Sequence, residues 1–379
     1  MASKTKTWKQ SPILYILVAA ALVALALYVR QHIHFNWTVF VEQLKLANWS
    51  MIGCGIGLIS LGYVVRATRW ALFLKPAQKV PLFSRAWFHV LGAQVIGYTG
   101  VALLGRPADL MRPYLVSRRL KMPLSAQVAV YVVERMFDLA AMALLFSTVL
   151  IFAPDRASLP HPELLRHIAI VGLAGTATLG VLATIIRISG SSVAGGSERI
   201  LGRLSPSLGS SVAAKISAFR DGLEMLGSLR DVLNALLQSL FMWGLIAGAY
   251  WITLRAFVDS PPLRHLTLSE IMVLMAVGMA SSTIQLPVVG WFTQIGIFAA
   301  ALQKIFGVAW EPALGSSAVL LIVTYLSILP TGLIWARVDR ISLRKITKET
   351  EDSVQRSEVG DEEKTPPFSE SQSASTVDS

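Results

Sequence analysis

Arginine and aspartate stand at helical spacing inside one largely apolar stretch of the sequence. In "GYTGVALLGRPADLMRPYLVSRRL", residues 97–120, Arg106, Asp109 and Arg112 are three positions apart and share one face of a helix. Charged side chains are costly inside a membrane, where they face a partner or a wet cavity. A guanidinium group also suits bidentate binding of phosphate. The spacing predicts either a structural salt bridge or a site for a phosphate-bearing ligand.

A second charged group follows in "VVERMFDLAAMALLF". Glu134 and Asp138 are four residues apart on one helical face, and Arg135 stands beside them. Two interpretations remain open. In the first, the acids pair with Arg106 or Arg112 and lock the fold. In the second, the neutralised network leaves one arginine with a hydrogen-bonding position for an anionic head group. Both can hold at once.

A third polar stretch, "SSTIQLPVVGWFTQIG", carries uncharged donors and acceptors around a Pro287/Gly290 break. Gln285 and Gln294 are candidates for ligand contact. The serines and Thr283 are expected instead to bond the backbone groups that the break frees.

The elements that position these groups are membrane helices. The chain is 54% hydrophobic and 15% charged, and its apolar runs reach the ~20 residues that cross ~30 Å of hydrocarbon as a helix. Six full spans are expected, at residues 12–29, 50–67, 123–152, 167–187, 232–257 and 315–338. Glycine and proline interrupt two further apolar regions, 86–117 and 268–308. The fold class is an all-α, polytopic helical bundle with eight to ten membrane helices.

The basic residues predict the orientation of these spans. They form short clusters between apolar runs, one of which contains Arg66, Arg69 and Lys75, and such clusters face the cytoplasm. Residues 85 and 118 then lie on the same side, so 86–117 must enter and return. By the same logic 268–308 enters from the opposite side. Paired broken hairpins of opposite orientation, an inverted repeat, are typical of transporter binding sites. The alternative is that both regions are ordinary helix pairs.

The sequence predicts one membrane domain followed by a tail. Residues 1–346 are expected to form one membrane domain with an interfacial linker at 188–231, which contains an amphipathic helix. An acidic tail, 347–379, is expected to be disordered. The N-terminal span is interpreted as an uncleaved anchor rather than a cleaved signal peptide. Both termini are placed in the cytoplasm.

Several other functions are not favoured. Clustered basic residues between spans do not form a nucleic-acid-binding stripe. One cysteine, Cys54, permits no internal disulfide, and the histidines lack paired metal spacing, so we expect no metal or cofactor. The sequence also lacks the signatures of nucleotide-binding, serine-hydrolase and zinc-protease sites, and we expect no enzyme activity.

The motifs "GRPADLMRPYLVSRRL", "VVERMFDLAAMALL" and "LPVVGWFTQIG" resemble the flippase-like, lysylphosphatidylglycerol-synthase transmembrane-domain family. The resemblance covers about residues 12–340. The residues that match its first two motifs are Asp109, Arg112, Tyr114, Arg118, Glu134, Arg135 and Asp138. The aminoacyltransferase domain of two-part relatives is not expected, because only the acidic tail follows the last span.

The third motif departs from the family pattern. Val288 and Val289 replace glycines, and Gln294 stands where the family commonly has a glutamate. The departure implies a different lipid or a weaker ion requirement than in relatives with the glutamate.

The resemblance implies a lipid translocase of the inner membrane. A phospholipid, polyprenyl-phosphate glycolipid or hopanoid-type lipid would be bound through its anionic head group between the two hairpins. Candidate partners besides membrane lipids are lipid-modifying enzymes or a second copy of the chain. A membrane subunit or enzyme of lipid or glycolipid biosynthesis and a small-solute transporter are the alternatives. The candidate binding residues are Arg106, Asp109, Arg112, Tyr114, Arg118, Glu134, Arg135, Asp138, Gln285, Pro287 and Gln294.

Overall fold

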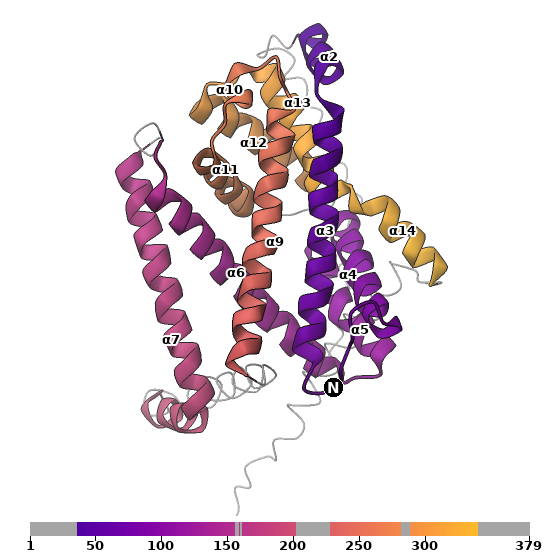
Figure 1. The fold of residues 1–379 in the computed structure, drawn as a ribbon, viewed down its shortest axis with the longest axis vertical. Coiled ribbons are helices and arrows are strands. Elements are labelled where there is room, and N and C mark those ends of the chain that lie inside the picture. The colour runs from indigo at the N-terminus through magenta and orange to yellow at the C-terminus, as the bar shows by residue number, and fades with distance from the viewer. Residues whose placement is uncertain (1–35, 156–158, 160, 202–227, 282–288, 340–379) are drawn as a thin grey trace, which may run out of the picture.

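A computed structural model describes residues 36–155, 159, 161–201, 228–281 and 289–339. All regular elements in these ranges are helices, which confirms the predicted all-α class. In chain order they are α2 (Trp37–Leu46), α3 (Trp49–Leu74), α4 (Arg85–Leu104), η1 (Arg106–Leu110), α5 (Met111–Leu120), α6 (Leu124–Phe152), α7 (Pro162–Leu201), α9 (Leu229–Arg255), α10 (Pro261–Arg264), α11 (Leu268–Ser281), α12 (Val289–Phe306), α13 (Trp310–Leu321), η3 (Ile322–Leu326) and α14 (Ile328–Val338) (Figure 1).

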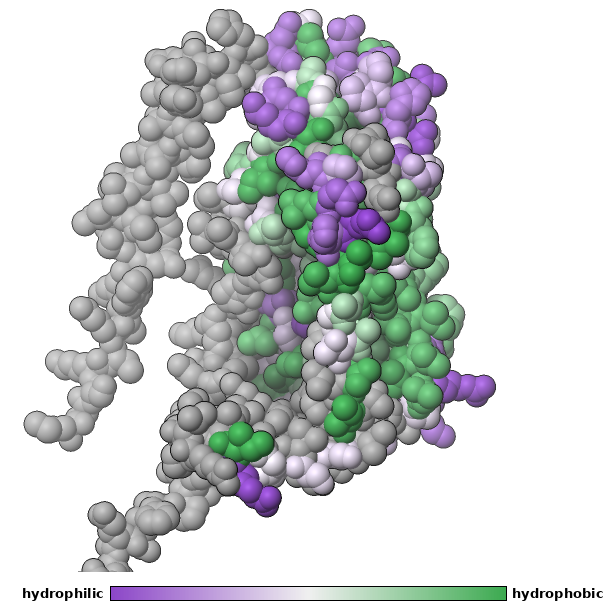
Figure 2. All heavy atoms as spheres, turned by 90° about the vertical axis from the view of Figure 1, so that its left-hand side faces the viewer, coloured by the Kyte–Doolittle hydropathy of each residue, from purple (hydrophilic) through white to green (hydrophobic). Residues whose placement is uncertain are grey.

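Five of the described stretches are long and apolar enough to cross a membrane: α3, α4, α6, α9 and the α13–α14 segment. Large apolar side chains remain exposed along them, for example Leu139 on α6 and Phe241 on α9. On the face drawn in Figure 2, hydrophobic residues form a broad area below hydrophilic residues that gather at the upper end. The protein is a multi-pass membrane protein.

The stretch 86–117 folds as a helix that is followed by a short returning helix. α4 ends at Gly105, whose φ of +81° favours glycine, and η1 begins directly after it. α5 then packs back along α4 and ends at Lys121 in the left-handed conformation. The ten residues of α5 extend only ~15 Å, half of a bilayer core. In α4, 67% of the span window is buried, against 22–39% in the other four, so α4 is enclosed largely by protein.

The second broken region consists of α11 and α12, which pack against each other. α11 has 14 residues, which extend ~21 Å and cannot cross the hydrocarbon alone. In Figure 1 this pair lies toward the upper end, whereas α4 and α5 lie in the lower half. The connection at 282–288, which holds Gln285 and Pro287, lies outside the described residues. The predicted entry of the two hairpins from opposite membrane faces stays a prediction.

The two broken regions belong to two different hydrophobic cores. One joins α3, α9, α11, α12 and α13, and contains Tyr250 and Phe298. The other joins α3, α4, α5 and α6, and contains Trp70 and Trp87. α3 contributes to both, so this helix connects the two ends of the bundle.

Other expected segments have mixed outcomes. The expected span 167–187 lies within α7, which departs from helical geometry at Ser189 and continues to Leu201. The first part of the expected linker is therefore helical. The expected N-terminal span, the amphipathic helix of the linker and the acidic tail lie outside the described residues.

The orientation can be tested with single cysteines at exposed positions. In a Cys54→Ala background, Lys79→Cys and Arg118→Cys should both be shielded from an impermeant thiol reagent added outside intact cells, because both positions belong to basic clusters that are expected to face the cytoplasm. Pro262→Cys, at the opposite end of α9, should react. Reaction at 118 with protection at 79 would mean that residues 86–117 cross the membrane fully.

Candidate functional site

An ionic cluster lies where α3, the α4–α5 hairpin and α6 meet. Its members are Arg66, Arg69, Asp109, Arg112, Glu134, Arg135 and Asp138. The structure thus brings together five of the candidate residues that the sequence predicted: Asp109, Arg112, Glu134, Arg135 and Asp138. It adds two arginines from α3.

Arg112 is enclosed at the centre of this cluster. Its side chain is 0% exposed, and its two terminal nitrogens donate to Asp109 at 2.8 Å and Glu134 at 2.9 Å. Nη1 also donates to Gln94 and Tyr98 of α4. A Cβ atom at Gly97 would lie 2.1 Å from Cγ of Arg112, so glycine is required there for α5 to approach α4.

The carboxylates of α6 are held by arginines of a different helix. Arg69 donates to Glu134 at 2.9 Å and to Asp138 at 2.6 Å, and all three side chains are buried. Arg69 also donates to Ser239 of α9. Arg66 reaches Asp138 at 3.4 Å. Each buried charge therefore has an opposite charge close by, as burial in an apolar bundle demands.

Asp109 is fixed from two elements. It accepts hydrogen bonds from Arg112 and, at 2.7 Å, from the Tyr131 hydroxyl of α6. The tip of the first hairpin is thereby joined to α6 as well as to its own returning helix.

Arg135 is held more loosely than the other arginines. Its Nη2 lies 3.5 Å from Glu134 and 3.5 Å from Asp138, the longest ion pairs of the cluster, and donates to the Tyr98 hydroxyl at 3.1 Å. Within the part of the chain that the structure describes, Nη1 makes no hydrogen bond. The side chain is 36% exposed, against 0% for Arg69 and Arg112.

The cluster carries an excess of positive charge. Among its described members, four arginines face three carboxylates, which leaves one unit of positive charge in an apolar surrounding. Because Arg135 has the longest ion pairs and an open side, the excess is concentrated on it. The arrangement can hold one anionic group at this edge.

The remaining predicted residues lie at other places. Tyr114 and Arg118 lie on α5, where the Arg118 guanidinium stands 5.8 Å from the Tyr114 ring. Arg106 begins η1, and its side chain is outside the described part of the structure. Gln294 lies half-buried on α12, whose buried residues belong to the other core.

Arg66 and Arg69 correct one sequence-based assignment. The sequence predicted that both belong to a basic, cytoplasm-facing cluster at the end of a span at 50–67. In the structure α3 continues to Leu74, and Arg69 is completely buried within it. The missed signal is "WALFL", residues 70–74, which extends the apolar run beyond both arginines. Their spacing of three places them on the helix face that α6 meets.

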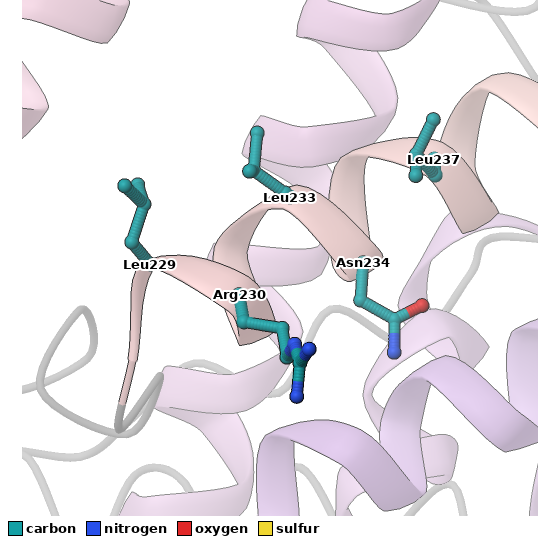
Figure 3. A pocket seen from close by; sticks show the side chains of 5 residues that line it. All are labelled: Leu229, Arg230, Leu233, Asn234 and Leu237. Carbon is teal, nitrogen blue, oxygen red and sulfur yellow. The ribbon is translucent and has the colours of Figure 1, made fainter.

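An open groove on α9 is distinct from this cluster. It is lined by Leu229, Arg230, Leu233, Asn234 and Leu237. Figure 3 shows the leucines on one side of the helix, with Arg230 and Asn234 directed away from them. The three leucines are exposed, whereas Ser239, which contacts Arg69, is buried. We assign the groove to the lipid-facing surface.

The cluster is built from arginine–carboxylate pairs. Among the described residues no three His, Cys, Asp or Glu side chains gather as metal ligands. The three carboxylates of the cluster are each engaged by arginine.

Fold and site together define a polytopic α-helical membrane protein with an ionic cluster at a broken helical hairpin. The chain matches the family model described as "Lysylphosphatidylglycerol synthase TM region" over residues 13–332, and it belongs to this family. Membership indicates a role related to membrane lipids. No curated protein matches the chain.

Replacement of Arg69 tests whether the cluster supports the fold. Arg69→Met removes the buried partner that Glu134 and Asp138 share, so we expect a loss of about 3 kcal/mol or more, seen as a lower melting temperature in detergent. Arg166→Met removes an exposed pair with Glu163 and should change stability by less than about 1 kcal/mol. Equal melting temperatures for the two variants would contradict a structural role for the cluster.

Proposed function

We propose that this protein is a lipid translocase of the cytoplasmic membrane that binds the anionic head group of a membrane lipid at the edge of the ionic cluster. The observation that carries the proposal is the excess positive charge on Arg135, partly exposed and with an unbonded Nη1. An uncompensated charge inside an apolar bundle is costly, and an anionic ligand removes that cost. Family membership supports a lipid as the source of the anion.

Arg135 is better placed for this role than Arg112. The sequence placed Arg112 among the candidate binding residues, together with Arg106 and Arg135, but both terminal nitrogens of Arg112 are engaged by carboxylates and its side chain is inaccessible. A ligand would have to break two buried ion pairs to reach it. At Arg135 the ligand would displace only two 3.5 Å contacts.

The short hairpins support movement as well as binding. α5 and α11 are too short to span the hydrocarbon alone, and in the proposed mechanism the N-terminal end of α5 and the C-terminal end of α11 lie at membrane depth. Non-helical backbone is tolerated at that depth where it is enclosed by protein or lines a wet cavity. In the proposed mechanism the head group passes along such a cavity, with both termini of the chain in the cytoplasm, while the acyl chains remain in lipid.

Arg135→Gln separates ligand binding from folding. It leaves Arg66, Arg69 and Arg112 against three carboxylates, a neutral cluster, so the melting temperature should stay close to that of the wild type. Binding of phosphatidylglycerol in nanodiscs and movement of a fluorescent phosphatidylglycerol in proteoliposomes should fall at least tenfold. Arg112→Gln should instead lower the melting temperature, because it removes the fully buried partner that Asp109 and Glu134 share at 2.8 and 2.9 Å.

Arg166→Gln, an exposed arginine on α7, is the matched control and should bind and move lipid as the wild type does. Full phosphatidylglycerol transport by Arg135→Gln would refute the proposal. A covalently altered lipid in the same assay would identify a biosynthetic enzyme, and uptake of free glycerol phosphate without lipid movement would identify a solute transporter.

A further inference from the structure

Tyr98 of α4 stands among three arginines of the ionic cluster. Its hydroxyl accepts hydrogen bonds from Arg112 Nη1 at 3.2 Å and from Arg135 Nη2 at 3.1 Å. The guanidinium groups of Arg112 and Arg66 lie over its ring, 4.5 and 5.1 Å from the centroid. The residue is half-buried, so it borders the open side of the cluster together with Arg135.

The hydroxyl of Tyr98 is left with a proton to donate. A phenolic oxygen has one proton and two acceptor lone pairs, and two guanidinium donors occupy those lone pairs here. Among the described residues no group accepts the proton. The Tyr131 hydroxyl differs, because it donates to Asp109. Donation from two cationic groups to a hydroxyl polarises it and makes it a stronger donor.

We infer that Tyr98 is a second ligand of the anion, donating its hydroxyl proton to one oxygen while Arg135 Nη1 donates to another. The inference rests on the proposed function and extends it by naming the anion that the site selects. Two donors side by side favour an anion with two unprotonated oxygens on one atom, as in a phosphodiester. The two arginines fix the direction in which the Tyr98 hydroxyl donates. Arg112 can approach this hydroxyl because Gly97, the residue before Tyr98, has no side chain in its way.

Tyr98→Phe tests the inference because it removes the hydroxyl and keeps the ring. Affinity for phosphatidylglycerol in nanodiscs should fall about tenfold, equal to about 1.4 kcal/mol, while affinity for diacylglycerol, which has no phosphate, should not change. The matched control is Tyr63→Phe, whose ring centroid lies 5.3 Å from that of Tyr98 and which should bind as the wild type does.

The outcomes separate this inference from the function on which it rests. If Tyr98 only positions the arginines, Tyr98→Phe should lower the melting temperature of the empty protein as well as the affinity for phosphatidylglycerol, and a lowered melting temperature would overturn the inference. Unchanged phosphatidylglycerol affinity in Tyr98→Phe would also overturn it and leave the proposed function standing. A wild-type protein that does not prefer phosphatidylglycerol over diacylglycerol would overturn both.

Discussion

Neutralisation of charge inside an apolar bundle is the constraint on which this structure depends. Arg69, Arg112 and Glu134 are fully buried, and each would be prohibitively costly without its partner. The pairs cross between elements: Arg69 joins α3 to α6, and Arg112 joins the hairpin to α6. Glu134 therefore links three parts of the chain that are separated in sequence. The returning helix α5, which is too short to span the membrane alone, is held against α4 and α6 by these ion pairs as well as by packing.

The backbone of the hairpin is adapted to this constraint. Gly97 lets the stem of Arg112 lie directly on α4, and Gly105 turns the chain without strain so that Asp109 and Arg112 face the same neighbours. The C-terminal end of α5 is also held in place, because Arg119 donates to Asp339 at the end of α14 and to the His89 carbonyl oxygen. The charges are thus fixed from both sides, which limits how far the cluster can rearrange.

The sequence predicts part of this arrangement. Spacing of three or four residues identified Asp109, Arg112, Glu134 and Asp138, because acids and arginines on one apolar helix face need opposite charges nearby. Arg69 was missed, because the rule that places basic residues in cytoplasmic loops was applied to arginines still inside an apolar helix. Tyr98 carries no signal of its own: an aromatic residue in an apolar helix is common, and its role depends on three arginines from three other elements.

The balance of charges has a consequence for a protein that must release what it binds. A cluster of arginines without acids would hold an anionic head group too firmly for rapid transport. Here Glu134 and Asp138 lie 3.5 Å from Arg135, near enough to compensate it partly in the empty site and too far for strong hydrogen bonds. In the proposed translocase these carboxylates compete with the ligand for one guanidinium group. Binding then replaces the two 3.5 Å contacts of Arg135 with a closer anion, and the inner pairs of Arg69 and Arg112 keep the hairpin in place throughout the exchange.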